Sequence, residues 1–367
     1  MLYETPCLDA ADQRVLEEIE QHREKLRRLL QDSPVWERQL RRNLTARAIR
    51  GSCAIEGFVA SIDDVEDIQL GEPPIDASER TATEVAGYQR ATAYVQRLAD
   101  AGPDFRYSKE LLNGLHFMIQ GHHTGKRPGW WRTCAVYVTG LDDPAAPAYT
   151  APPADQVPAL TGELVDWLNA GDLDRPVMVR AAMAHLNLVH IHPWRDGNGR
   201  MSRLLQTLLL TRGDLAPEFA SIEEWLGRFD NTIRYYDVLG RVGGRSWTPA
   251  NDAHLWVRFC LDAHRQQAQL VAERARGQRE MWSLLADITE RRGYPERSRF
   301  ALVPAVAHQR VRLATYQRDA EIDEQTARRD FRRLTQDGWL DAYGDPRNRY
   351  YLAGLAVSKE VGEVVPR

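Results

Sequence analysis

The chain has 367 residues, a formal net charge of −4 and a hydrophobic content of 43%, values typical of a globular protein with about two or three domains and a large core. The mild acidity argues against nucleic-acid binding through the whole surface, while a basic sub-region stays open. The chain contains no run of eighteen apolar residues and begins without a basic-then-apolar signal, so we expect neither a transmembrane helix nor a secretory leader. The four cysteines, Cys7, Cys53, Cys134 and Cys260, lie far apart without metal-type spacing, which predicts free thiols in a reducing cytoplasm.

The first sixty residues are predicted to be mainly helical. A charged helix with an apolar stripe starts near residue 9 and is interrupted at Ser33-Pro34, and a second helix spans Trp36 to Ile49. The segment that follows, Ser52-Cys53-Ala54-Ile55-Glu56-Gly57, has no distinctive chemistry by itself. Taken alone, it predicts a helix end whose one carboxylate faces solvent.

Serine N-caps mark two further helices. Ser78 begins a helix with an apolar face that closes at Gly102-Pro103, and Ser108 caps another that ends at Gly121.

Between Lys126 and Pro153 the pattern changes to that of a β-hairpin. Val136-Tyr137-Val138 is β-branched and aromatic, and Ala148-Tyr149-Thr150 is placed to pair with it. A hairpin outside a helical core is only marginally stable by itself.

A twelve-residue loop, His192-Pro193-Trp194-Arg195-Asp196-Gly197-Asn198-Gly199-Arg200-Met201-Ser202-Arg203, carries most of the chemistry. It lies between two apolar helical segments, residues 177–189 and 204–210, so we expect it to join two buried helices. Pro193 ends the first helix, and Gly197 and Gly199 allow backbone amides to turn toward one point. The second helix aims its positive N-terminal end at the same point.

The charged side chains of this loop complete a polyphosphate site. Arg200 and Arg203 are three residues apart and share one face of the first helical turn. Asp196 can hold a divalent cation that bridges phosphates, and His192 can take a proton from a hydroxyl. Each feature alone is common in turns or on solvated helix faces, but their convergence between two buried helices predicts a charged ligand.

The loop resembles the signature of the Fic family, His-Pro-Phe-x-Asp/Glu-Gly-Asn-Gly-Arg-x-x-Arg, with Trp194 in place of the usual phenylalanine. Proteins of this family transfer AMP from ATP to a Ser, Thr or Tyr hydroxyl of a target protein. The resemblance implies His192 as the general base, Asp196 as the Mg²⁺ ligand and Arg203 as the residue that grips the γ-phosphate. It assigns the other phosphate contacts to Gly197, Asn198, Gly199 and Arg200.

The family resemblance also changes the interpretation of the segment at 52–57. It is similar to the family's inhibitory motif, Ser/Thr-x-x-x-Glu-Gly/Asn, which makes Ser52 and Glu56 part of an N-terminal inhibitory helix and pairs Glu56 with Arg203. A carboxylate and a γ-phosphate would then compete for one guanidinium. The hairpin at about residues 126–153 looks like the family's flap, which adds target backbone as an extra strand.

Two more helices are predicted after the loop, at residues 222–239 and 251–269, the second closing the core. The resemblance places Tyr235 or Tyr236 beside the nucleotide base, where an aromatic ring can stack.

From residue 280, after a polar run at 273–278, the pattern changes again. Helices at 311–319 and 325–334 followed by a β-hairpin resemble a winged helix–turn–helix module. Acidic neighbours dilute the charge of the second helix, and such modules also serve as docking or dimer surfaces. DNA contact, protein docking and a homodimer therefore all stay open. The side chains that would enter a major groove are Thr326, Arg328, Arg329, Arg332 and Arg333.

The sequence thus predicts a mainly α fold with N-terminal helices (1–60), a Fic-type core (61–270) and a winged helix–turn–helix domain (280–353). The predicted function is that of a protein adenylyltransferase that uses ATP and Mg²⁺ and is inhibited by Glu56. One alternative is that the same site removes AMP, with Glu56 positioning the attacking water, or uses another nucleotide. The other is a DNA-binding regulator whose Fic core senses nucleotide.

Overall fold

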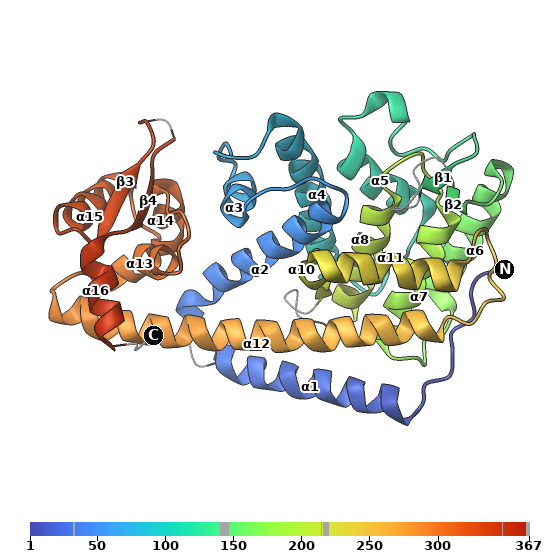
Figure 1. Ribbon diagram of the computed structural model, residues 1–367, viewed down its shortest axis with the longest axis horizontal. Helices are drawn as coiled ribbons and strands as arrows, with labels where there is room; N and C mark the ends of the chain where they lie inside the picture. Colours follow the sequence, from blue (N-terminus) through green and yellow to red (C-terminus); the bar gives the residue numbers. More distant parts are fainter. Residues whose placement is uncertain (32–33, 140–146, 214, 216–219, 347, 365–367) are drawn as a thin grey trace.

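The computed structural model describes residues 1–31, 34–139, 147–213, 215, 220–346 and 348–364. The described chain is mostly helical and contains two short antiparallel hairpins (Figure 1), which confirms the predicted fold class. None of the described helices combines the length and the apolar character needed to cross a membrane.

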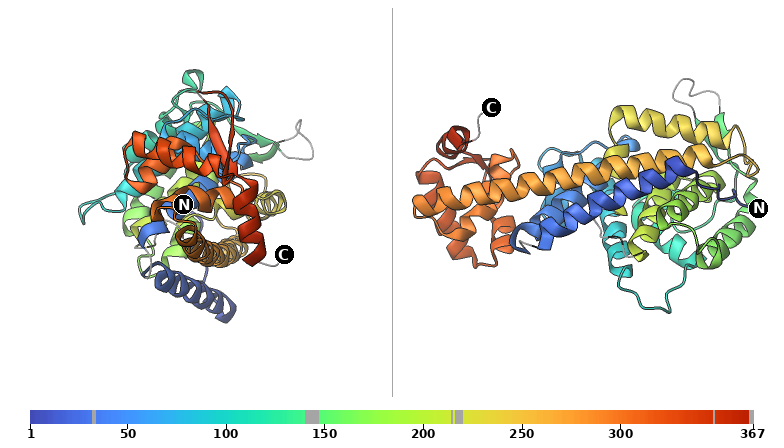
Figure 2. Two further views of the ribbon diagram at one scale, coloured as in Figure 1. Left: turned by 90° about the vertical axis from the view of Figure 1, so that its left-hand side faces the viewer. Right: turned by 90° about the horizontal axis from the view of Figure 1, so that it is seen from below.

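Two helices, α1 (Ala10–Gln31) and α12 (His254–Arg291), pack side by side along the molecule (Figures 1 and 2). With 38 residues, α12 is about 57 Å long. The predicted end of this helix at Gln269 is wrong, because α12 runs unbroken through the polar segment 273–278. Val271, Ala275 and Trp282 keep a buried stripe on one face of the helix, while the polar residues between them occupy the solvated face.

The centre of the core is the antiparallel pair α7 (Val177–Ile191) and α8 (Asn198–Arg212). Both are buried on almost every face, because other helices surround them. Ser78 and Ser108 accept hydrogen bonds from the backbone amides of Thr81 and Leu111, which confirms the two predicted N-caps. The surrounding helices are α4 (Glu79–Leu98), α5 (Lys109–Gln120), α6 (Val157–Ala170) and α12.

Helix α2 (Pro34–Ile55) extends beyond its predicted end at Ile49, so Ser52 lies on the helix itself. A close crossing fixes this end of α2. A Cβ added at Gly51 would lie 2.1 Å from the carbonyl oxygen of Glu223, and one at Gly227 would lie 2.5 Å from Gly51 Cα. Only glycines permit the two backbones to approach this closely.

The single helix predicted at 222–239 is wrong, because the chain forms α10 (Glu223–Leu226) and α11 (Phe229–Gly243), which are separated at Gly227. Short 3₁₀ turns lie at Thr124–Lys126, Ala154–Gln156 and Glu296–Ser298, and α3 (Ile62–Leu70) follows α2.

The C-terminal part contains the two predicted helices as α14 (Leu313–Ala320) and α15 (Glu324–Gln336), followed by the predicted hairpin, β3 (Leu340–Tyr343) and β4 (Tyr350–Ala353). Two helices were not predicted, α13 (Arg299–Val306) and α16 (Leu355–Val364). The winged helix–turn–helix assignment stays a prediction.

This C-terminal part shares a second hydrophobic core with the N-terminal helices. Leu26 of α1 and Trp36 and Leu40 of α2 are buried in it. Arg42 of α2 forms two hydrogen bonds of 2.5 and 2.8 Å with the carboxylate of Asp319. Helix α2 therefore packs on the C-terminal part near its start and carries the segment at 52–57 at its other end.

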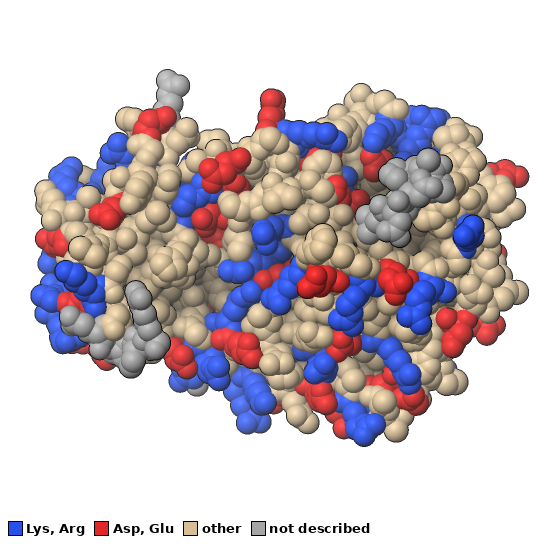
Figure 3. All heavy atoms as spheres, in the orientation of Figure 1, with Lys and Arg blue, Asp and Glu red and all other residues tan. Residues whose placement is uncertain are grey.

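The face drawn in Figure 3 shows positive and negative side chains interspersed, with no large area of one sign. This distribution agrees with the small net charge of −4.

Candidate functional site

The twelve-residue loop connects the C-terminus of α7 to the N-terminus of α8. His192 ends α7 in the left-handed region at φ +52°, and Gly197 precedes α8 at φ +77°. A histidine in this region is uncommon, whereas a glycine adopts it freely. The two reversals bring the loop back over the first turn of α8.

Trp194 anchors the loop in the core. Its ring is fully buried and stacks on His116, with ring centroids 4.5 Å apart, and its Nε1 donates to Asn113 Oδ1 at 3.0 Å. Asn198 closes the loop: its Oδ1 accepts from the amide of Trp194 at 3.0 Å, and its Nδ2 donates to the Trp194 carbonyl at 2.9 Å. The Asn198 side chain therefore shapes the loop, and its phosphate contact stays a prediction.

His192 is held in the tautomer that a general base requires. Its Nδ1 lies 3.0 Å from the carbonyl oxygen of Val189, which can only accept a hydrogen bond. The proton therefore resides on Nδ1, and Nε2 keeps a free lone pair. Burial lowers the pKa of His192 to about 4, so the ring is neutral at pH 7.

We expect a histidine-selective NMR titration to find His192 neutral at about pH 6, with its resonance assigned by loss in a His192→Ala variant. Its native pKa lies below the 6.5 of an ordinary histidine. The unfolded chain binds this proton first, so the stability that the neutral ring contributes is complete above about pH 6.5 and is lost as the pH falls through about 4. Protonation of His192 centred near pH 6.5 would contradict the assigned state.

Arg203 pairs with the segment that resembles the inhibitory motif. Its Nε donates to Ser52 Oγ at 2.8 Å, and its Nη2 lies 3.1 Å from the Ser52 carbonyl and 2.7 Å from Glu56 Oε1. The predicted contact between Glu56 and Arg203 is therefore confirmed. A Cβ at Gly199 would lie 2.5 Å from Glu56 Oε1, so the carboxylate sits against the N-terminus of α8, where an anion is favoured.

Arg200 is paired with Glu84 of α4, a residue that was not predicted to belong to the site. Arg200 Nη1 lies 2.5 Å from Glu84 Oε2, and both side chains are almost fully buried. Burial alone would raise the pKa of Glu84, but the hydrogen bond from Arg200 outweighs it and leaves the pKa at about 2. The carboxylate is therefore ionised and fixes the guanidinium beside the loop.

Several buried polar atoms around the loop have no hydrogen-bond partner among the described residues. They are Arg200 Nε, Arg203 Nη1 and both amide atoms of Gln120, whose side chain lies against Gly197. Buried donors are rarely left unmatched in native proteins. Two guanidinium nitrogens and an amide facing a helix N-terminus match an anionic ligand in both charge and hydrogen bonding.

Asp196 lies at the open side of the loop. Its Oδ1 accepts from the amide of Gly197 at 2.6 Å, and its other oxygen forms an ion pair with Lys126, a second residue missed from the sequence. About a third of its side chain is exposed. A partly exposed carboxylate is a suitable oxygen ligand for Mg²⁺ once Lys126 moves aside.

The two tyrosines of α11 have different positions. Tyr235 is 1% exposed, and its hydroxyl lies 3.0 Å from His185 Nε2, so it belongs to the core. The expectation that Tyr235 stacks on a base is therefore corrected. Tyr236 is partly exposed beside Ile55, so Tyr236 is the member of this pair that could stack on the base of a nucleotide.

The predicted hairpin strands are present as β1 (Tyr137–Thr139) and β2 (Pro147–Thr150), while residues 140–146 lie outside the described residues and the flap role stays a prediction. Arg132, buried at the base of the hairpin, ties it to the loop. Its Nε donates to the carbonyl of His192 at 2.8 Å, and its Nη2 donates to that of Pro152 at 2.5 Å. Arg132 thereby links the base of the hairpin to the backbone of His192.

Comparison with known proteins gives one family match and several relatives. Residues 106–210 match the Fic/DOC family. The chain is 30% identical over 254 residues to protein adenylyltransferase Fic of Aedes aegypti, which covers 68% of this chain and 46% of that protein. It is 33% identical over 214 residues to the protein of the same name from Culex quinquefasciatus, which covers 58% and 38%. The chain thus spans less than half the length of these curated relatives.

Solved structures share the fold. A Fic family protein from Desulfovibrio desulfuricans superimposes with a TM-score of 0.59 at 22% identity and covers 96% of this chain and 98% of its own. Fic-1 from Caenorhabditis elegans gives a TM-score of 0.58 at 24% identity, over 73% of this chain and 74% of its own.

Proposed function

Because residues 106–210 form a Fic/DOC family domain, we propose that this chain is a protein adenylyltransferase that transfers AMP from ATP to a Ser, Thr or Tyr hydroxyl. Curated relatives that carry this name support the reaction type. The observation that carries the proposal most directly is the group of unmatched donors from Arg200, Arg203 and Gln120, which faces the same loop as the neutral His192.

The residues of the loop account for each step. His192 Nε2 accepts the proton of the target hydroxyl, whose oxygen attacks the α-phosphorus of ATP as the bond to pyrophosphate breaks. Arg203 and the amides at the start of α8 hold the β- and γ-phosphates in line with that attack. Asp196 would hold Mg²⁺, which supplies positive charge to the phosphates when it is bound.

Target placement is proposed to depend on the flap. The strand pair β1–β2 is small and stands at the edge of the helical core, and an extended segment of a target protein can add to it through backbone hydrogen bonds. Arg132 links the foot of this hairpin to the carbonyl of His192. A target bound along the hairpin would therefore lie close to His192, the proposed general base.

We propose that Glu56 inhibits this reaction. It holds the guanidinium that the γ-phosphate needs, so ATP can enter but its triphosphate is displaced from the in-line position.

The free thiols of the exposed Cys7 and Cys134 support a reducing compartment, and we propose the cytoplasm.

The proposal is tested by finding which phosphate of ATP is transferred to protein. We expect the Glu56→Gly variant to acquire label from ATP labelled in the α-phosphate and none from ATP labelled in the γ-phosphate, since pyrophosphate leaves. Label from the γ-phosphate would identify a kinase-type reaction instead. Loss of label when wild-type protein is added to the purified modified protein would support AMP removal, with Glu56 positioning the water.

We also propose that the C-terminal part binds duplex DNA through α15. This helix buries Ala327, Phe331 and Leu334 on one side and leaves Arg329 and Arg332 exposed on the other. Arg328 and Arg333 are also exposed, but Arg328 pairs with Glu324 on the helix and Arg333 with Asp337 just after its end. Arg329 and Arg332 therefore contribute most of the usable positive charge.

For the full chain we expect a DNA affinity that falls with salt. The double variant Arg329→Ala/Arg332→Ala should have a slope of log affinity against log salt that is smaller by about 2, since each phosphate neutralised by an arginine adds roughly 0.9 to that slope. The double variant Arg23→Ala/Arg27→Ala on α1 is a matched control that should bind as wild type. DNA binding that depends neither on salt nor on Arg329 and Arg332 would exclude α15 as the DNA-binding surface and would favour a role in protein docking.

A further inference from the structure

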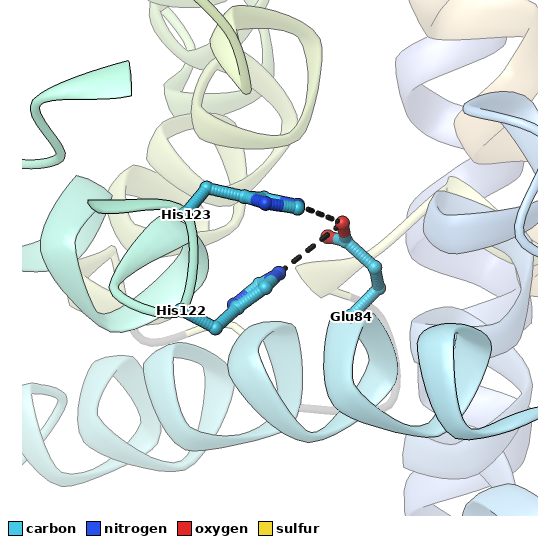
Figure 4. Close-up of side chains that lie close together, drawn as sticks. All are labelled: Glu84, His122 and His123. Carbon is cyan, nitrogen blue, oxygen red and sulfur yellow. Dashed lines mark hydrogen bonds and ion pairs between the residues drawn. The ribbon is translucent and has the colours of Figure 1, made fainter. Parts of the chain in front are cut away.

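Three side chains outside the signature loop form a compact cluster (Figure 4). Glu84 projects from α4, and His122 and His123 follow the end of α5. His123 Nε2 lies 2.6 Å from Glu84 Oε1, and His122 Nε2 lies 3.2 Å from the same oxygen. All three side chains offer a ligand atom, and these atoms lie within 4.8 Å of one another.

The polar atoms of this cluster are incompletely satisfied. Neither ring nitrogen of His122 makes an aligned hydrogen bond, although both are inaccessible to solvent. Two imidazoles face one carboxylate oxygen, while the other oxygen, Oε2, accepts from Arg200 at 2.5 Å. Ring nitrogens that are buried without an aligned hydrogen bond, in a histidine that faces a carboxylate, favour a further partner such as a metal ion.

The spacing fits one metal ion. In a tetrahedral zinc site with ligands about 2.0–2.1 Å from the ion, neighbouring ligand atoms are about 3.3 Å apart. The His122–Glu84 separation of 3.2 Å is close to that value, and the His123–Glu84 separation of 2.6 Å needs only a small outward movement. The His123 side chain is 32% exposed, so water can reach the fourth position and an ion has a path of entry.

We infer that Glu84, His122 and His123 bind one transition-metal ion, best matched by Zn²⁺, with water as the fourth ligand. Two imidazoles and one carboxylate form a nitrogen-rich set that suits zinc, in contrast to the oxygen ligand Asp196 proposed for Mg²⁺. Glu84 Oε1 would bind the ion while Oε2 keeps its bond to Arg200. The ion would thus fix the carboxylate that positions Arg200 beside the loop.

The described residues contain a second group with metal-like spacing, Asp9, Asp12 and His254. There Arg258 already pairs with both carboxylates, which satisfies their charge without an ion. This group carries no proposal, and it supplies the matched control.

Cobalt titration of the untagged full-length protein tests the inference. We expect one equivalent of Co²⁺ to bind with the visible absorption of a tetrahedral site and to be displaced by Zn²⁺. His122→Ala and His123→Ala should each weaken binding at least about tenfold, and His254→Ala should bind as wild type. The absence of a thiolate-to-cobalt charge-transfer band would exclude the exposed Cys7 and Cys134 as ligands.

A second measurement uses only the wild-type chain and does not depend on how the variants fold. Zinc should protect the partly exposed His123 from diethyl pyrocarbonate, with the modified residues located by mass spectrometry, and should leave the reactivity of the exposed His308 unchanged. Failure of the wild type to bind an equivalent of metal, equal binding by the His122 and His123 variants, or loss of binding in His254→Ala would overturn the inference. None of these outcomes depends on the transferase activity.

Discussion

The Glu56→Gly variant is expected to label itself from ATP about 10- to 150-fold faster than wild type. The change removes the carboxylate that occupies Arg203, and one hydrogen bond between charged groups is worth about 1.5–3 kcal/mol. With Glu56 absent, the γ-phosphate can take the guanidinium, and the α-phosphorus reaches the in-line position. The measurement is the initial rate of incorporation of the labelled α-phosphate into protein.

Two further variants make this prediction specific. Glu56→Gln keeps the shape of the side chain without its charge and should give an intermediate rate. Glu72→Gly removes a carboxylate from the turn after α3, which has only a loose 3.8 Å contact with Arg312, and should behave as wild type. If Glu56→Gly labels itself no faster than Glu72→Gly, the inhibitory role of Glu56 is excluded.

Adding His192→Ala to the Glu56→Gly variant is expected to lower transfer by about 10²- to 10⁴-fold, the usual contribution of a general base. The Glu56→Gly background is necessary because the inhibited wild type is expected to transfer AMP too slowly for a further decrease to be measured. His192 contributes no phosphate contact, so ATP affinity should stay within about twofold of the parent.

The control for this variant is His308→Ala, which removes an exposed histidine from the C-terminal part and should leave the rate unchanged. Transfer by the His192→Ala double variant within a few-fold of its parent would assign proton removal to another group. An equal loss of ATP binding would show that the residue acts on the nucleotide instead.

The local features of this chain are readable from its sequence. Ser78 and Ser108 identify helix starts because an N-cap bonds to an amide three residues away. The signature loop can also be predicted from the sequence. Its histidine, glycines and arginines lie within twelve consecutive residues, and the ends of α7 and α8 set their geometry. The hairpin at 137–150 follows from β-branched and aromatic residues on both strands.

The partners of the loop come from distant segments, and no local pattern marks them. Glu84 lies 116 positions before Arg200 and appears in the sequence as one more acid on an amphipathic helix. Arg132 lies 60 positions before His192, and only the buried carbonyls around it reveal its role. The packing of Gly51 against Gly227 is equally non-local, and it holds the end of α10 against the turn of α2 that precedes Ser52.

The wrong predictions have equally physical causes. Adjacent residues on a helix point about 100° apart, so only one of Tyr235 and Tyr236 could face a ligand. Tyr235 is buried in the core, which leaves Tyr236. The polar run at 273–278 suggested a domain boundary, but all of its residues except Gly277 are good helix formers, and one buried stripe was enough to continue α12.

Calorimetric binding of ATP and of ADP to wild type and to Glu56→Gly tests the central claim most directly, namely that Glu56 occupies the place of the γ-phosphate on Arg203. In wild type the two nucleotides should bind with similar affinity, because the extra phosphate finds its guanidinium taken. In Glu56→Gly, ATP should bind at least about tenfold more tightly than ADP. An unchanged ratio of ATP to ADP affinity in the two proteins would contradict the account.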